Sequence, residues 1–264
     1  MPMHRLITIR FSHYNEKARW ALDRYRVPYR EDGYLPMFHF APMMLLSAQH
    51  GMGKSDRVSS PFSTPALLTD DGRVMRDSSE IVRYVSDRFA KGALYPTPEV
   101  GELEQRFHDE LGPHTRRVAY FFALGDPALL PRIADENVGR AQAWAFKRVA
   151  PLVTRGIRRN LRVDRAHADR SRDKVLAVFD EVSRRVAGRQ YLVGDTFSAA
   201  DLAFACMAAP ALLPTPDEGY GAWLPPVDAV PSEIAKVVTE LRASEAGKYA
   251  LRMFATERRA RDVS

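Results

Sequence analysis

The chain has 264 residues, of which 45% are hydrophobic and 27% charged, a composition that excludes an intrinsically disordered protein. The formal net charge is +6, but acidic residues are interspersed with the arginines almost everywhere. Mixed charge of this kind is typical of solvated helix faces, so we do not expect a nucleic-acid-binding surface. A mild positive field would still help to collect a small anionic ligand.

The single cysteine, Cys206, excludes an intramolecular disulfide, and its apolar helical surroundings predict an inert buried thiol. The seven histidines are scattered without metal-ligand spacing, so no metal is expected. The N-terminus has no long apolar region, and the apolar stretch 202–213 is too short to cross a bilayer. We therefore expect a cytoplasmic protein that does not enter the membrane.

The first elements follow from hydrophobic periodicity. A β-branched run at residues 5–10 predicts a strand. Apolar residues at helical spacing predict an amphipathic helix over residues 16–25, with Ser12 in the N-cap position. A second strand at residues 29–32 and a helix at about 42–49 complete this part.

A hairpin comes next, with arms at residues 66–69 and 73–76 joined by the acidic turn 70–72. A helix with one apolar face is predicted over residues 78–89. The order βαβ followed by ββα predicts a thioredoxin-like domain over residues 1–93.

Everything after a proline-containing linker at residues 94–98 is predicted to be helical, so that residues 99–264 form an all-α domain. The expected fold class is therefore α/β plus all-α. Gly112-Pro113 is expected to bend or break the first of these helices. The predicted helices cover residues 99–124, 130–162, 166–187, a segment from Ser198 onward, 231–243 and 245–259.

The helix that begins at Ser198 has the clearest start signal in the chain. Ser198 and Asp201 have the S-x-x-D spacing of a capping box, and Phe197 and Leu202 occupy the two hydrophobic-staple positions.

Four segments, 11–20, 63–67, 77–81 and 194–201, occur in the order and spacing of one known family. With the predicted two-domain order, they make the chain resemble the cytosolic glutathione transferase superfamily, as a serine-type, bacterial-like member. The likeness extends over nearly the whole chain. It implies glutathione as co-substrate, a small hydrophobic electrophile as second substrate, and a homodimer.

The resemblance implies a role for each residue around the hairpin. A cis Thr64–Pro65 bond would leave the Thr64 backbone groups free to pair with the cysteinyl part of glutathione. Ser78, at a helix N-terminus, would bind the γ-glutamyl carboxylate, and Asp77 would meet the ammonium group. The alternative is that Asp77 and Ser78 only cap their helix.

Ser12 is the candidate for thiol activation. A free thiol has a pKa near 8.5, so a hydroxyl that donates to sulfur would favour the reactive thiolate. The alternatives are that Ser12 only caps the helix, or that Tyr14 or Asn15 is the donor. Family members that transfer thiols carry a cysteine in this loop; Ser12 and Asn15 stand at the two C-x-x-C positions, so dithiol chemistry is not expected.

Residues 33–62 should supply a basic group for the glycyl carboxylate, with His50, Lys54 and Arg57 as candidates. An electrophile pocket between the two halves is expected, although Met and aromatic clusters more often belong to a core. The candidate pocket residues are Met37, Phe38, Phe40, Met43, Tyr120, Phe121 and Phe122.

Two other functions are considered beside the transferase. The long 33–62 segment and the basic residues 258–261 would also suit a non-catalytic binding or regulatory protein that uses this fold as a dimeric platform. Nucleic-acid binding through the arginines is the third function considered, and it predicts that the affinity for DNA or RNA falls steeply with salt concentration.

Overall fold

The computed structural model describes residues 3–51, 60 and 62–258. Its N-terminal half begins with β1 (His4–Ile9), α1 (His13–Arg24) and β2 (Tyr29–Tyr34). β1 and β2 are parallel, with His4 opposite Tyr29, so these three elements form a βαβ unit. α2 (Phe40–His50) follows.

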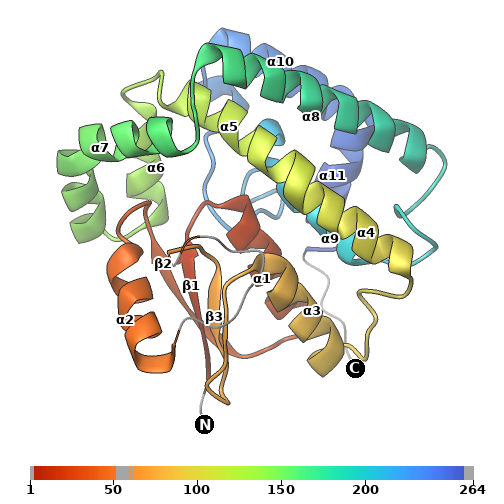
Figure 1. The fold of residues 1–264 in the computed structure, drawn as a ribbon. Helices are drawn as coiled ribbons and strands as arrows, with labels where there is room; N and C mark the ends of the chain where they lie inside the picture. The colour runs from red at the N-terminus through yellow and green to blue at the C-terminus, as the bar shows by residue number, and fades with distance from the viewer. Residues whose placement is uncertain (1–2, 52–59, 61, 259–264) are drawn as a thin grey trace.

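The predicted hairpin is present as β3 (Ala66–Leu68) and β4 (Val74–Met75), which are antiparallel, and α3 (Ser78–Phe89) follows. The sheet order is β2-β1-β3-β4. Side chains that alternate along β1 reach opposite faces: Leu6 joins the core under α1 and α3, and Ile7 joins the core under α2. Figure 1 accordingly shows α2 on one side of the sheet and α1 with α3 on the other.

The first helix of the second half passes through Gly112-Pro113 without a break. α4 (Pro98–Arg106) continues through η1 (Phe107–Leu111), a π-helical turn, into α5 (Gly112–Ala123). The π-helical turn lies directly before Pro113. Proline has no N–H to donate, so the regular α-helical hydrogen-bond pattern is interrupted at this point.

The prediction of one helix over residues 130–162 is wrong. The structure has α6 (Leu129–Asn137) and α7 (Arg140–Asn160), separated by two extended residues. The Asn137 side chain exchanges two hydrogen bonds with the Trp223 backbone, donating at 3.0 Å and accepting at 3.1 Å. This pairing with a segment 86 residues away fixes the end of α6, so local periodicity alone could not reveal it.

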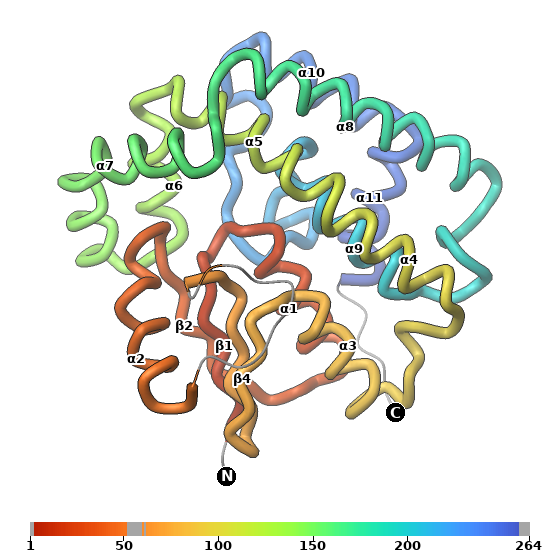
Figure 2. The backbone as a smooth tube through the Cα atoms, in the orientation of Figure 1, coloured from red at the N-terminus to blue at the C-terminus, as the bar shows by residue number. Residues whose placement is uncertain are grey.

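The remaining helices are α8 (Arg165–Val186), α9 (Ala199–Leu212), α10 (Ser232–Ala243) and α11 (Glu245–Thr256), with the short η2 (Val227–Ala229) before α10. α9 is the centre of the helical half, and almost all its residues are buried, including Cys206. The capping box of Ser198 and Asp201 is confirmed. Figure 2 shows α4 and α5 running over α9 and α8 running beside α5, with the sheet below them.

The two halves share one hydrophobic core, in which Trp20 of α1 packs against Phe197 and Phe254. Arg258 is not part of an exposed basic tail, because its guanidinium pairs with Glu16 and Asp23 of α1 at 2.7 Å each. Residues 259–261 lie outside the described part. The architecture is thus a thioredoxin-like half followed by a helical half, as predicted. Within the described residues, none of the helices is both long and apolar enough to cross a membrane.

Candidate functional site

The N-terminus of α1 lies between the sheet and the helical half. Ser12 is the N-cap residue, as predicted, but its hydroxyl caps no backbone N–H of the helix. Its own N–H donates to the carbonyl of Ile9 at 2.9 Å, which holds the start of the helix against the end of β1. Ser12 also lines a large cavity.

The Thr64–Pro65 peptide bond is cis and leads directly into β3. The Asn15 side chain links this bond to the start of α1, because its Nδ2 donates to the Ile9 carbonyl at 3.0 Å and to Thr64 Oγ1 at 3.4 Å. Asn15 is fully buried, and its Oδ1 has no hydrogen-bond partner among the described residues. Ser12 and Thr64 are therefore brought to the same edge of the sheet.

Asp77 and Ser78 begin α3, at the same end of the N-terminal half. The Asp77 carboxylate accepts from the N–H of Ser79 at 2.7 Å and of Glu80 at 3.2 Å, so it caps the helix. Both residues are buried, Asp77 being 5% and Ser78 1% exposed. They are covered by His108, whose Nε2 lies 3.5 Å from Asp77 Oδ2 and whose Nδ1 lies 3.4 Å from Ser78 Oγ.

His108 belongs to a buried polar cluster that sequence reasoning missed. Lys17 of α1 forms an ion pair with Glu104 of α4, and its Nζ lies 3.3 Å from His108 Nδ1. Ser79 Oγ donates to Glu104 at 2.6 Å and also contacts Lys17 at 2.8 Å. Burial alone would raise the pKa of Glu104. The nearby Lys17 charge and the hydrogen bonds to this carboxylate outweigh burial and hold its pKa below the usual value. The only sequence signal was a lysine on the apolar side of a predicted helix.

Tyr14, the alternative candidate for thiol activation, contacts this cluster. Its hydroxyl donates to the His108 carbonyl at 3.1 Å, and its ring packs edge-on against the His108 ring. Burial raises the pKa of Tyr14 to about 12, so its hydroxyl stays protonated at neutral pH.

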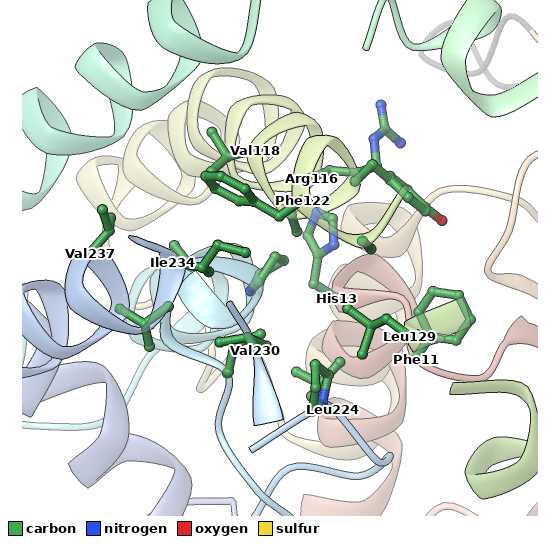
Figure 3. A pocket seen from close by; sticks show the side chains of 18 of the residues that line it. Phe11, His13, Arg116, Val118, Phe122, Leu129, Leu224, Val230, Ile234 and Val237 are labelled. Carbon is green, nitrogen blue, oxygen red and sulfur yellow. The ribbon is translucent and has the colours of Figure 1, made fainter. Parts of the chain in front are cut away.

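One large cavity opens beside Ser12 and extends into the helical half, enclosing about 1140 Å³ including its open mouth. Figure 3 shows side chains converging on it from α1, α5, α10 and the segment before α10. Its walls are mostly aliphatic and aromatic, and among the described residues neither Asp nor Glu contributes to them. The residues from its two sides include Phe11, Ser12 and His13, then Arg116, Val118, Tyr120, Phe122, Leu129, Leu224, Val230, Ile234 and Val237.

Of the seven candidate pocket residues, two aromatic residues of α5 line the cavity, and the other five follow the core alternative. Tyr120 and Phe122 line the cavity, and Phe121 does not. Met43 is fully buried under the sheet, packed with Ile7. The other three predicted residues also pack outside the cavity lining: Met37, Phe38 and Phe40.

Of the three residues predicted to bind the glycyl carboxylate, the structure describes only His50. His50 ends α2, and its side chain is exposed. Lys54 and Arg57 lie outside the described residues. Nor does the described part contain a group of three or more histidine, cysteine, aspartate or glutamate side chains arranged to hold a metal.

Two family models match the chain in the order of its two halves. The glutathione S-transferase N-terminal domain matches residues 11–88, and the C-terminal domain of the same family matches residues 165–232. The chain belongs to the glutathione S-transferase family. No curated protein matches its sequence significantly.

Solved glutathione transferases share this fold at low sequence identity. One from Ceriporiopsis subvermispora, in complex with glutathione, has a TM-score of 0.60 at 16% identity, covering 99% of this chain and 100% of that one. One from Burkholderia graminis, with two glutathione molecules bound per subunit, has a TM-score of 0.56 at 16% identity, covering 97% and 84%. One from Rhodospirillum rubrum has a TM-score of 0.54 at 17% identity, covering 96% and 99%.

Proposed function

We propose that this glutathione S-transferase family member is a cytoplasmic, homodimeric, serine-type transferase, which joins the thiolate of glutathione to small hydrophobic electrophiles. The observation that carries the proposal is the position of Ser12. It lies at the N-terminus of α1, linked through Asn15 to the cis Thr64–Pro65 bond, and it borders an apolar cavity. A thiol held along Thr64 would then meet an apolar second substrate beside Ser12.

In this proposal residues 1–93 bind glutathione and residues 99–264 supply most of the electrophile pocket. The Thr64 backbone pairs with the cysteinyl unit next to Pro65. Ser78 and Asp77 receive the γ-glutamyl carboxylate and ammonium at the N-terminus of α3. Because both are covered by His108, the proposal requires the His108 ring to turn away when glutathione binds.

Ser12 acts by donating its hydroxyl to the glutathione sulfur. This hydrogen bond stabilises the thiolate, and the thiolate attacks the electrophilic carbon without a covalent enzyme intermediate. Removing one such donor typically lowers the rate by about 100-fold. Each unit by which the thiol pKa rises corresponds to about 1.4 kcal/mol of lost thiolate stabilisation.

The test combines retention on immobilised glutathione, calorimetry, and turnover of a chlorinated nitroaromatic by wild type and Ser12→Ala. We expect Ser12→Ala to retain glutathione affinity, lose about 100-fold in turnover, and raise the pKa of the pH–rate profile. Ser232→Ala is the matched control, because Ser232 is an exposed serine at the first position of α10. Normal turnover by Ser12→Ala would remove Ser12 from this role.

A non-catalytic binding or regulatory protein is the second candidate, and the burial of Asp77 and Ser78 behind His108 favours it. In that case the polar cluster fixes the two halves together, and glutathione has no route to α3. Calorimetry on wild type and His108→Ala separates the two functions. A transferase binds glutathione, and His108→Ala exposes the site; absence of binding in both, with a protein partner recovered by pull-down, supports the regulatory function.

A further inference from the structure

The outer face of α7 carries arginines and large apolar side chains that the core does not use. The helix packs inward through Ala143, Phe146 and Val153, which are buried. Its opposite face carries five exposed residues, which we call the outer stripe: Trp144, Arg148, Leu152, Arg155 and Arg159. Their spacing of i, i+4, i+8, i+11 and i+15 puts them on one side of the helix. Figure 1 shows α7 at the margin of the molecule, so this side is free to meet a partner.

The charge of this segment differs from that of the rest of the chain. Residues 137–163 contain six arginines, one lysine and no acidic residue, whereas the net charge of the whole chain is +6, so the remainder is nearly neutral. Lys147 pairs with Asp135 at 2.6 Å, and Arg158 donates to the Leu124 carbonyl at 2.7 Å. The three arginines of the outer stripe form no ion pair with an acidic side chain among the described residues. Such a concentration of unpaired positive charge favours a partner with a negatively charged surface.

The apolar members of the outer stripe narrow the choice of partner. Trp144 is 59% exposed and Leu152 is 62% exposed. The Arg148 guanidinium lies 4.1 Å from the centroid of the Trp144 ring, so the cation stacks on the indole. Tryptophan beside arginine suits the headgroup level of a membrane, where the indole sits at the interface and the guanidinium binds lipid phosphate. The phosphate backbone of a nucleic acid would satisfy the arginines but would leave Leu152 in water.

We propose that the outer stripe of α7 attaches the protein to a negatively charged lipid surface. Its three arginines contact the lipid phosphates, and Trp144 and Leu152 enter the headgroup layer between them. α7 lies along this surface without crossing it, since none of the described helices is long and apolar enough to span a membrane. The large cavity takes no lining residue from α7, so attachment leaves that cavity open. Binding requires neither glutathione nor turnover, and the inference therefore goes beyond the proposed function.

Flotation of the full chain with lipid vesicles, in the absence of glutathione, tests the proposal. One set of vesicles contains phosphatidylcholine alone, and the other contains phosphatidylcholine mixed with phosphatidylglycerol. We expect binding to the anionic vesicles to be at least about tenfold tighter, and the difference to shrink at high salt because the surface charge is screened. Equal binding to both sets, or no binding to the anionic set at low salt, would overturn the proposal.

Two triple variants then assign the binding to α7 rather than to net charge. Replacing the three arginines of the outer stripe with glutamine should weaken binding to anionic vesicles about 100-fold, because each arginine near such a surface contributes about fivefold. The charge-matched control replaces three exposed arginines outside α7 with glutamine and should lose less than about fivefold. These control residues are Arg88, Arg184 and Arg189. Equal losses in the two triple variants would also overturn the proposal.

Tryptophan fluorescence separates entry into lipid from binding to another partner. Trp144 is the exposed one of the three tryptophans, since Trp20 is buried and Trp223 is half-buried. Brominated lipid should quench part of the emission of wild type, and Trp144→Phe should abolish that quenching. Leu152→Ser should weaken vesicle binding about tenfold through the loss of apolar contact. If the arginine triple variant instead loses binding to duplex DNA, or loses self-association in sedimentation, while wild type ignores anionic vesicles, the outer stripe has a different partner and the proposal fails.

Discussion

Removing the Lys17 ammonium should destabilise the protein far more than an ordinary surface substitution. Lys17 is fully buried and Glu104 is 3% exposed, so Lys17→Met leaves a carboxylate in the core without its cation. Breaking one side of a buried ion pair costs about 3–5 kcal/mol. The substitution also removes the hydrogen bond to Ser79 and the contact with His108, which join α1 to α3 and to η1.

The pH dependence provides an independent check on this explanation. In wild type the pKa of Glu104 is lowered, so its contribution to stability is present above about pH 4.5 and is lost as the pH falls through the folded value. Without Lys17, burial dominates and raises that pKa. The folded state of Lys17→Met then prefers the protonated acid, so its deficit relative to wild type should shrink as the pH is lowered toward 5.

Urea unfolding at pH 7 and pH 5 measures both effects. Replacing both partners with apolar side chains, as Lys17→Met with Glu104→Leu, should recover most of the loss, because no buried charge is left alone. Lys248→Met is the matched control, because it breaks the exposed pair of Lys248 with Glu245 and should cost under about 1 kcal/mol. A loss below about 1 kcal/mol for Lys17→Met, or a deficit that does not change with pH, would refute the reasoning.

Three further predictions concern the core. Asp201→Ala should cost about 3 kcal/mol or more in urea unfolding, because the buried N–H groups of Leu192 and Ser198 lose the carboxylate that accepts them at 2.8 and 2.7 Å. Gly247→Ala should cost more than about 2 kcal/mol, since its Cβ would lie 1.9 Å from a backbone carbonyl oxygen, whereas Gly156→Ala in α7, which meets nothing within 4 Å, should be neutral or stabilising by about 0.5–1 kcal/mol. Burial alone would raise the pKa of Glu16, but the Arg258 and Arg19 charges outweigh it and hold this pKa below its usual value. The free energy of unfolding of wild type should therefore decrease when the pH is lowered below about 4.5. Glu16→Gln should be less stable at pH 7 and show a flatter acid dependence; an unchanged acid profile would contradict this.

The sequence determined the elements whose signals are local. α3 begins at Ser78 and ends at Phe89 as predicted, because a helix start and a one-sided apolar stripe both lie within that segment. The capping box at Ser198 was readable for the same reason, since its two residues are three positions apart. The thioredoxin-like order followed from the alternation of such elements, and the family resemblance followed from motifs in that order.

The candidate site divides in the same way. Sequence motifs pointed to Ser12, Thr64 and Asp77, and the structure brings the first two to one edge of the sheet through Asn15. The roles of these residues toward glutathione stay predictions. Which residues face the cavity was decided by the helical half, and Met43 of the N-terminal half, a candidate for either environment, lies in the core.

Only the tertiary structure decided which polar groups meet. Lys17 and His108 are 91 residues apart, and nothing in either segment specifies the other as its partner. The burial of His13 Nε2 without a hydrogen-bond partner among the described residues is likewise a property of the folded surroundings and not of the local sequence. Periodicity and capping act over a few residues and can be read along the chain, whereas burial and the pairing of charges depend on segments that only folding brings together.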